Sequence, residues 1–273
     1  MHLEIISRKS KKNVSASKSG QPRPNIVFVH GICVGAWIWD EYFLQYFADH
    51  GYDVHALSLR GHGKSDGENG LLMWSLADYA NDLDNVVKSL DGPVIVVGHS
   101  MGGAVVQDWL RMGMSREKAV GAALLASVPP WGLVYSAVRM GLYSPHLFGE
   151  ISRMLVTGTE QINKEAMREA LFSESTSDEI VNKFLDNLSN ESLVASAEVQ
   201  GLRPFAPLPW MNSLPMFVGG AVDDCFIPNF EVNRTASYYG VDAVMVKDLA
   251  HSIMIDKNWE EMAKPLLSWA DKL

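Results

Sequence analysis

The stretch VIVVGHSMGGAVVQDWLRM, residues 94–112, decides the fold. It opens with an unbroken apolar run, which is typical of a strand that is covered on both faces of a parallel sheet. It closes with apolar residues at the spacing of an amphipathic helix. Between the two, three glycines surround Ser100. A strand, a G-x-S-x-G turn and a helix together predict that a serine hydroxyl is exposed at the carboxyl edge of a sheet.

The glycines are explained by the geometry of such a turn. Its backbone is strained, and side chains at Gly98 and Gly102 would collide with the neighbouring elements. The turn also places Ser100 at the first turn of a helix, where free N–H groups and the helix dipole favour negative charge. Ser100 is therefore the candidate nucleophile.

Apolar runs and amphipathic segments alternate along the rest of the chain. The runs predicted as strands cover residues 25–31, 52–59, 93–100, 119–127, 215–221 and 242–248. The segments predicted as helices include residues 41–49, 76–90, 101–112, 229–239 and 257–271. This alternation predicts an α/β fold with a mostly parallel central sheet flanked by helices.

The domain organisation follows from where the alternation stops. Residues 131–210 show helical patterns without a strand of comparable quality, which predicts a helical lid over the carboxyl edge of the sheet. The core is then formed by residues 25–130 and 211–273. Residues 1–24 carry the only basic cluster and are expected to be a flexible arm. Because no opening hairpin is evident there, we expect a sheet that is shortened at its first edge.

Composition narrows the classes of function. The chain has 273 residues and a formal net charge of -9, which argues against nucleic-acid binding. It has no secretory signal and no apolar run long enough for stable membrane insertion, so we expect a cytoplasmic protein. The two cysteines, Cys33 and Cys225, form no disulfide framework and match no metal-ligand spacing. We expect no cofactor and no metal, and the sequence leaves a homodimer open.

A serine nucleophile needs a base, and the base needs an acid to orient it. His251 follows the last predicted strand and is the candidate base. Asp223 and Asp224 follow the strand before it, and neighbouring residues of an extended loop face opposite ways, so only one of them can serve. We favour Asp224 and expect Asp223 to be solvated or to cap a helix. The remaining histidines are interpreted as structural. His30 and His99 are expected to support their own loops. The others are expected to have no partner: His2, His50, His55, His62 and His146.

The reaction also needs donors for the oxyanion of its tetrahedral intermediate. The residue after the nucleophile, Met101, and a residue of the loop after the first long strand, Ile32, are the candidate backbone donors. In the predicted lid, an apolar stripe is expected to form the mouth of the site and to bind substrate. Its members that we assign to substrate binding are Trp131, Val134, Met140 and Leu147.

From Asn25 to its C-terminus the sequence resembles the α/β-hydrolase superfamily, in particular its serine esterase and lipase branch. Five motifs carry the resemblance in order: HGICVGAWIW (30–39), SLRGHGKSDG (58–67), GHSMGG (98–103), DDCFIP (223–228) and LAHSIM (249–254). The serine at position 100 argues against the dehalogenases and epoxide hydrolases of this fold, which have aspartate there. The HG of residues 30 and 31 is not extended to HGGG, unlike in the hormone-sensitive-lipase-like esterases.

These observations predict a serine hydrolase that cleaves carboxylic esters with small to medium apolar acyl or aromatic groups. Its partner would be a small-molecule ester substrate, and the triad Ser100, His251 and Asp224 would form an acyl-enzyme. Two alternatives stay open. A carbon–carbon bond hydrolase that cleaves a diketone would use the same triad, and a triad-bearing small-molecule receptor would turn substrate over slowly.

Overall fold

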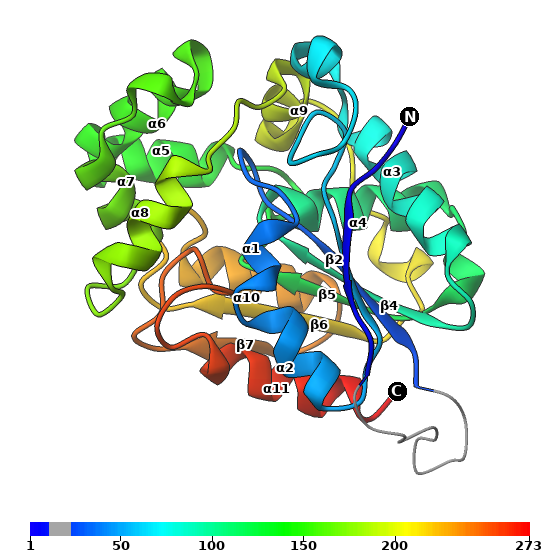
Figure 1. Cartoon of the computed structure of the whole chain (residues 1–273). Coiled ribbons are helices and arrows are strands. Elements are labelled where there is room, and N and C mark those ends of the chain that lie inside the picture. The colour runs from blue at the N-terminus through cyan, green and yellow to red at the C-terminus, as the bar shows by residue number, and fades with distance from the viewer. Residues whose placement is uncertain (11–22) are drawn as a thin grey trace.

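The computed structural model describes residues 1–10 and 23–273 and shows one seven-stranded sheet (Figure 1). Its strands are β1 (Ile5–Arg8), β2 (Asn25–Val29), β3 (Val54–Leu57), β4 (Val94–His99), β5 (Ala119–Leu125), β6 (Met216–Ala221) and β7 (Ala243–Val246). The order across the sheet is β1-β3-β2-β4-β5-β6-β7. Only the β1–β3 pair is antiparallel; all the other pairs are parallel. The predicted α/β class and mostly parallel sheet are confirmed.

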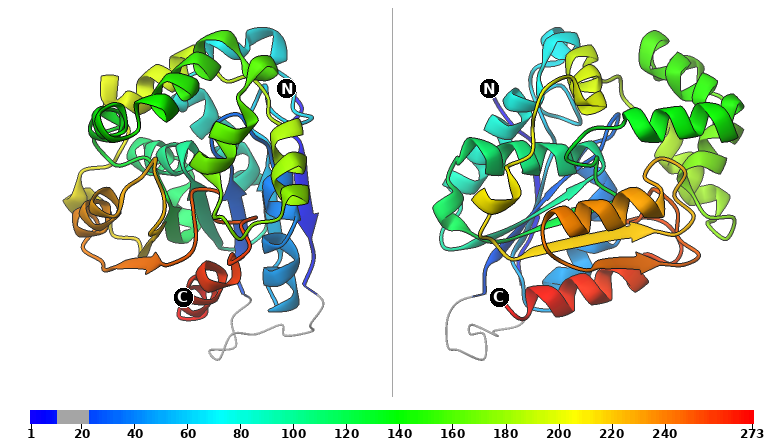
Figure 2. Two further views of the ribbon diagram at one scale, coloured as in Figure 1. Left: turned by 90° about the vertical axis from the view of Figure 1, so that its left-hand side faces the viewer. Right: turned by 180° about the vertical axis from the view of Figure 1, so that it is seen from behind.

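Helices cover both faces of the sheet (Figure 2). One face packs against α1 (Trp37–Asp40), α2 (Phe43–Asp49) and α11 (Glu260–Ala270). The other face packs against α3 (Leu76–Ser89), α4 (Met101–Met112) and α10 (Asn229–Tyr238). This double cover explains the continuous apolar runs, because both sides of each central strand are buried.

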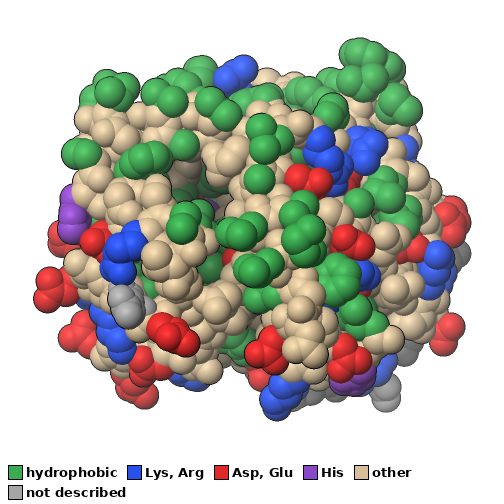
Figure 3. Space-filling model, turned by 90° about the horizontal axis from the view of Figure 1, so that it is seen from above, with side chains coloured by type: hydrophobic (Ala, Val, Ile, Leu, Met, Phe, Trp, Pro, Cys, Tyr) green, Lys and Arg blue, Asp and Glu red, His purple; other side chains and the backbone are tan. Residues whose placement is uncertain are grey.

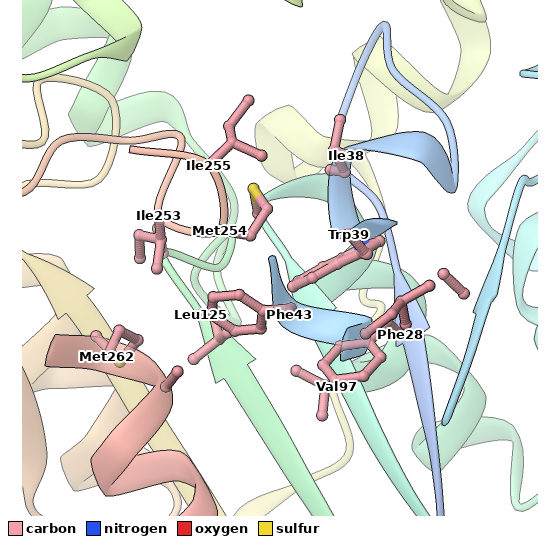
Figure 4. Packing of buried hydrophobic residues seen from close by; sticks show 14 of the residues in the cluster. Phe28, Ile38, Trp39, Phe43, Val97, Leu125, Ile253, Met254, Ile255 and Met262 are labelled. Atoms are coloured by element: carbon pink, nitrogen blue, oxygen red, sulfur yellow. The ribbon is translucent and has the colours of Figure 1, made fainter. Parts of the chain in front are cut away.

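The core on the first face is built from alternate strand residues. Phe28 of β2 and Val97 of β4 pack against Trp39 and Phe43, which come from α1 and α2 (Figure 4). The rings of Phe28 and Trp39 lie 4.8 Å apart. This packing fixes the strands relative to the helices, and with them the starting points of the loops at their carboxyl ends.

The first edge of the sheet differs from the prediction. Residues 5–8 form strand β1, which pairs with β3 in the register Ile5 to Leu57, so the expected flexible arm and shortened sheet are wrong for this stretch. The side chains add to the pairing, because the Ser7 hydroxyl hydrogen-bonds His55 Nδ1 at 2.8 Å and Arg8 pairs with Asp40. The strand is short and half exposed, as an edge strand is, and only two of its four residues are apolar, so its apolar signal is weak. Residues 11–22 of the predicted arm lie outside the described residues.

The segment between β5 and β6 is helical, as expected, and lies over one end of the sheet (Figure 1). Its helices are α5 (Val134–Tyr143), α6 (Pro145–Thr157), α7 (Lys164–Leu171), α8 (Asp178–Asp186), α9 (Leu193–Ala197) and the π-helical turn η4 (Glu198–Leu202). We call this segment the insertion; that it opens and closes as a lid stays a prediction. None of the helices in the described ranges has the length and apolar character needed to cross a bilayer.

Candidate active site

Ser100 lies in a strained turn between β4 and α4. Its backbone has a φ of 52° and a ψ of -120°, and α4 begins at the next residue. A methyl group on Gly98 would lie 2.4 Å from the carbonyl oxygen of Gly102, and one on Gly102 would lie 2.4 Å from the backbone oxygens of Val29 and His30. The glycines are therefore required by close approach of backbone to backbone, as the sequence predicts.

Gly102→Ala is expected to destabilise the protein strongly, because the added methyl would collide with backbone atoms of Val29 and His30, which the central sheet holds in place. We expect a loss in the free energy of unfolding of about 3 kcal/mol, at the upper end of the overpacking range. Gly149→Ala is the matched control, since no atom lies within 4 Å of the added methyl and the residue is inside α6. That change should stabilise by roughly 0.5–1 kcal/mol. Urea unfolding measures both; equal effects would contradict the account of the turn.

The structure brings Ser100, His251 and Asp224 together from three separate loops. The Oγ of Ser100 lies 3.1 Å from Nε2 of His251, and Nδ1 of His251 lies 2.8 Å from Oδ2 of Asp224. The other oxygen of Asp224 accepts hydrogen bonds from the N–H groups of Phe226 and Ile227, at 2.8 and 3.0 Å. All three side chains of the triad are buried. Both oxygens of the carboxylate are thus occupied, which fixes its orientation.

Asp223 is exposed, and the carboxylate that faces His251 is that of Asp224. Its backbone N–H donates to the carbonyl oxygen of Leu249 at 3.2 Å, which ties together the loops that carry the acid and the base. Adjacent residues of this loop thus point in opposite directions.

The backbone of His251 is hydrogen-bonded by the side chain of His99. The Nε2 of His99 donates to the carbonyl oxygen of His251 at 2.8 Å, and the two rings lie 4.9 Å apart. Burial, and next the charge of a protonated His251, hold the pKa of His99 well below its usual value. A neutral His99 with its proton on Nε2 therefore supports the backbone of His251. The expectation was support of its own loop, and the hydrogen bond is to the loop of His251 instead.

Ile32 and Met101 lie beside Ser100 along the same cavity. Among the hydrogen bonds of the described residues, neither backbone N–H donates to an acceptor. Free N–H groups next to a nucleophile are the arrangement that an oxyanion requires. Ile32 and Met101 stay the candidate oxyanion donors.

The cavity over Ser100 has a volume of about 360 Å³ and is mostly apolar. Its walls come from the loop after β2, the turn at Ser100, the insertion and the loops that follow β6 and β7. The apolar residues from the insertion are Leu133, Ala137, Met140, Phe148, Ile151, Met154, Leu155, Met167, Leu171, Phe184, Leu188 and Val199. In the view from above, apolar side chains surround a hollow in the surface (Figure 3). The hydroxyl of Ser136 also lines the cavity, buried and without a hydrogen-bond partner among the described residues.

Of the four predicted substrate-binding residues, Met140 lines the cavity and the other three do not. Trp131 donates from Nε1 to Glu231 at 2.8 Å and so faces α10. Val134 is 58% exposed on α5, and Leu147 is buried between the helices of the insertion. The prediction is corrected for these three residues. Trp131 lies in the turn before α5, and for Val134 and Leu147 the apolar pattern of a helix does not tell which face meets the cavity.

The two cysteines differ in their position. Cys33 lines the cavity, whereas Cys225 donates from Sγ to the carbonyl oxygen of Ala170 at 3.3 Å. Burial raises the pKa of both thiols, that of Cys225 to about 12 and that of Cys33 well above its usual value. Neither is therefore a thiolate near neutral pH. Within residues 1–10 and 23–273 no group of three or more His, Cys, Asp or Glu side chains is arranged to hold a metal ion.

Residues 26–264 match the model of the alpha/beta hydrolase family. The chain belongs to this family. As a member, this hydrolase is 32% identical to mouse (Mus musculus) protein phosphatase methylesterase 1 over 107 residues, which are 38% of this chain and 28% of that protein. It is 35% identical over 106 residues to a non-heme chloroperoxidase of Streptomyces lividans, covering 38% of this chain and 37% of that one. The hydrolase thus matches about a third of the length of these relatives.

A solved structure of a thermophilic esterase from Thermogutta terrifontis superposes on the hydrolase with a TM-score of 0.70. The alignment covers 99% of this chain and 93% of that chain at 20% identity. At this identity the likeness concerns the fold alone. Family membership and fold together support a hydrolase, and leave its chemical specificity to the site.

Proposed function

We propose that this hydrolase cleaves carboxylic esters through an acyl-enzyme on Ser100. The observation that carries the proposal is the unbroken chain of contacts from Ser100 Oγ through His251 to Asp224, at the wall of an apolar cavity. A hydroxyl, an imidazole and a carboxylate in this order are the groups that acyl transfer needs.

The reaction proceeds in two halves. Nε2 of His251 takes the proton of Ser100 while Oγ attacks the ester carbonyl, and the N–H groups of Ile32 and Met101 hold the oxyanion. The imidazolium, stabilised by Asp224, then donates the proton to the departing alkoxide, which leaves as an alcohol. Water, deprotonated by His251, attacks the acyl group, and the acid is released as Ser100 recovers its proton.

An acyl chain fits the cavity better than a polar group, because its walls are largely aliphatic and aromatic. Met140→Trp should therefore lower kcat/KM for p-nitrophenyl octanoate by about tenfold and leave p-nitrophenyl acetate nearly unchanged, since a bulkier ring takes the room of the distal acyl carbons. Val134→Trp is the matched control, because Val134 lies on the same helix but outside the cavity. If both variants shorten the acyl preference equally, the cavity does not hold the acyl chain.

The class of reaction is tested with a substrate panel on the wild-type protein. Esters, thioesters, lactones and diketones of matched size are compared by kcat/KM, and a halide-oxidation assay is included because relatives carry the name chloroperoxidase. A fluorophosphonate should label Ser100 alone, as located by peptide mass spectrometry. Turnover of a diketone that exceeds every ester would replace the proposal by carbon–carbon bond hydrolysis, and ligand binding without turnover would favour a receptor. A cytoplasmic location and a homodimer stay predictions.

A further inference from the structure

The loop that carries Ile32 is held by a carboxylate of the insertion. Cys33, the next residue, has a left-handed backbone with a φ of 62°, a conformation that costs a residue with a side chain roughly 1–3 kcal/mol. Its N–H donates to Oε2 of Glu191 at 3.1 Å, and its carbonyl oxygen accepts from the N–H of Ser189 at 2.8 Å. Both polar backbone groups of Cys33 are thus bound by a segment more than 150 positions away in the sequence.

Glu191 is surrounded by donors only. Its Oε2 accepts from Cys33 and lies 3.0 Å from Nε2 of His62, while Oε1 accepts from the hydroxyl of Tyr79 at 2.8 Å and from the N–H of Ser192 at 2.7 Å. Burial would raise the pKa of Glu191, but the charge of His62 and the hydrogen bonds to these donors outweigh burial and lower it. The carboxylate is therefore ionised, and its position is determined by four contacts.

His62 supplies the opposite charge. Nδ1 of His62 lies 3.1 Å from the carbonyl oxygen of Arg60, and Nε2 faces the carboxylate of Glu191, so both ring nitrogens need a proton. Burial opposes protonation, but Glu191 outweighs it and raises the pKa of His62. The neighbouring His30 differs: its Nε2 accepts from the N–H of Leu59, and burial with the charge of His62 lowers its pKa to about 3.

The sequence-based interpretation of His62 as a histidine without a partner is therefore corrected. His62 and Glu191 form a buried ion pair that joins the loop after β3 to the insertion. The partner was not foreseeable, because Glu191 lies in a polar stretch of the insertion with no motif around it.

We propose that Glu191 is a positioning residue of the oxyanion hole: by holding Cys33 in its left-handed conformation, it aims the N–H of Ile32 at the reacting carbonyl. The inference rests on the proposed function. Glu191 does not line the cavity and acts only through the loop. The insertion then completes the oxyanion hole in addition to walling the substrate cavity.

Glu191→Gln tests the proposal. An amide offers one accepting oxygen and one donating nitrogen, so at least one pair of the four donors around position 191 loses its acceptor. We expect kcat for p-nitrophenyl butyrate to fall by roughly 10- to 10²-fold, approaching the loss of an oxyanion donor, with KM changed less than about threefold. The rate constant for labelling by a fluorophosphonate should fall in parallel, because phosphonylation also develops charge on an oxygen.

Glu198→Gln is the matched control. Glu198 belongs to the same insertion, accepts from the N–H of Leu76 at 2.7 Å and pairs with Arg203, but has no contact with the loop of Ile32. Its loss should lower the melting temperature and leave kcat within about twofold of the wild type. That change in kcat is far smaller than the change expected from losing one oxyanion donor. A merely structural role of Glu191 would give the same result at both positions.

Glu191→Asp keeps the negative charge for His62 and serves if the glutamine variant does not fold. The shorter side chain withdraws the carboxylate from Cys33, so kcat should again fall with KM nearly unchanged. A folded variant at position 191 with the kcat of the wild type, or with a raised KM alone, overturns the proposal. If Ser100→Ala is inactive in the same assay, such a result at position 191 rules out only the positioning role of Glu191. If Ser100→Ala stays active, the proposed function itself fails.

Discussion

Ser100→Ala should abolish ester hydrolysis. The variant lacks the hydroxyl that lies 3.1 Å from Nε2 of His251, so the acyl-enzyme cannot form. We expect kcat for p-nitrophenyl butyrate to fall by about 10⁶-fold, as when the nucleophile of a serine hydrolase is removed. The remaining activity would be due to the oxyanion donors and to substrate binding. The measurement is initial-rate release of p-nitrophenol at saturating substrate.

The matched control for this loss is Ser127→Ala. Ser127 is also buried near the first turn of α4, where its hydroxyl bonds the carbonyl oxygen of Val128 and lies 3.2 Å from the side-chain nitrogen of Gln107. Its removal should lower the melting temperature more than Ser100→Ala does, and should leave kcat within a few fold. Activity of Ser100→Ala comparable with the wild type would identify a different nucleophile and end the proposal.

Asp224→Asn should be the second most damaging change. Nδ1 of His251 now donates to Oδ2 of Asp224; an amide at this position can rotate its NH2 toward the ring and select the tautomer that cannot accept the proton of Ser100. The amide also cannot stabilise the imidazolium. We expect kcat to fall by about 10⁴-fold with little change in KM. Steady-state kinetics with p-nitrophenyl butyrate measure this.

Asp223→Asn is an internal control one residue away. The same substitution removes a charge from the same loop, but on the exposed side of the backbone, so kcat should stay within about twofold, far from the effect of losing the triad acid. A large loss at position 223 together with a small one at 224 would mean that the loop is rearranged in the working enzyme and that the acid has been misassigned.

The fold was predictable because its signals are local. Each buried strand has to be apolar along its length, and the run of residues 93–100 with its G-x-S-x-G turn shows this directly. Strand β1 was not predicted, because four half-exposed residues at the edge of a sheet show little apolar periodicity. Its place depends on pairing with β3, a contact over about fifty positions of sequence.

The residues of the candidate site were likewise predictable only where their signal is local. Ser100 and His251 were predicted from the loops that follow strands, and Asp224 from the alternation of side chains on its loop; the structure places the three side chains in contact. Trp131 was misplaced, because its apolar surroundings predicted a helix, whereas the residue lies in the turn before α5. Its indole faces Glu231 on α10 instead of the cavity.

The sequence by itself predicted the α/β class, the strained turn at Ser100 and the candidate residues Ser100, Asp224 and His251, because each is marked by a short apolar run and the loop that directly follows it. Only the tertiary structure decided which side chains line the cavity and that Glu191 reaches Cys33. The physical reason is that burial and hydrogen bonding act between groups that folding brings together. The free energy of such a contact is not visible in the amino-acid pattern around either partner.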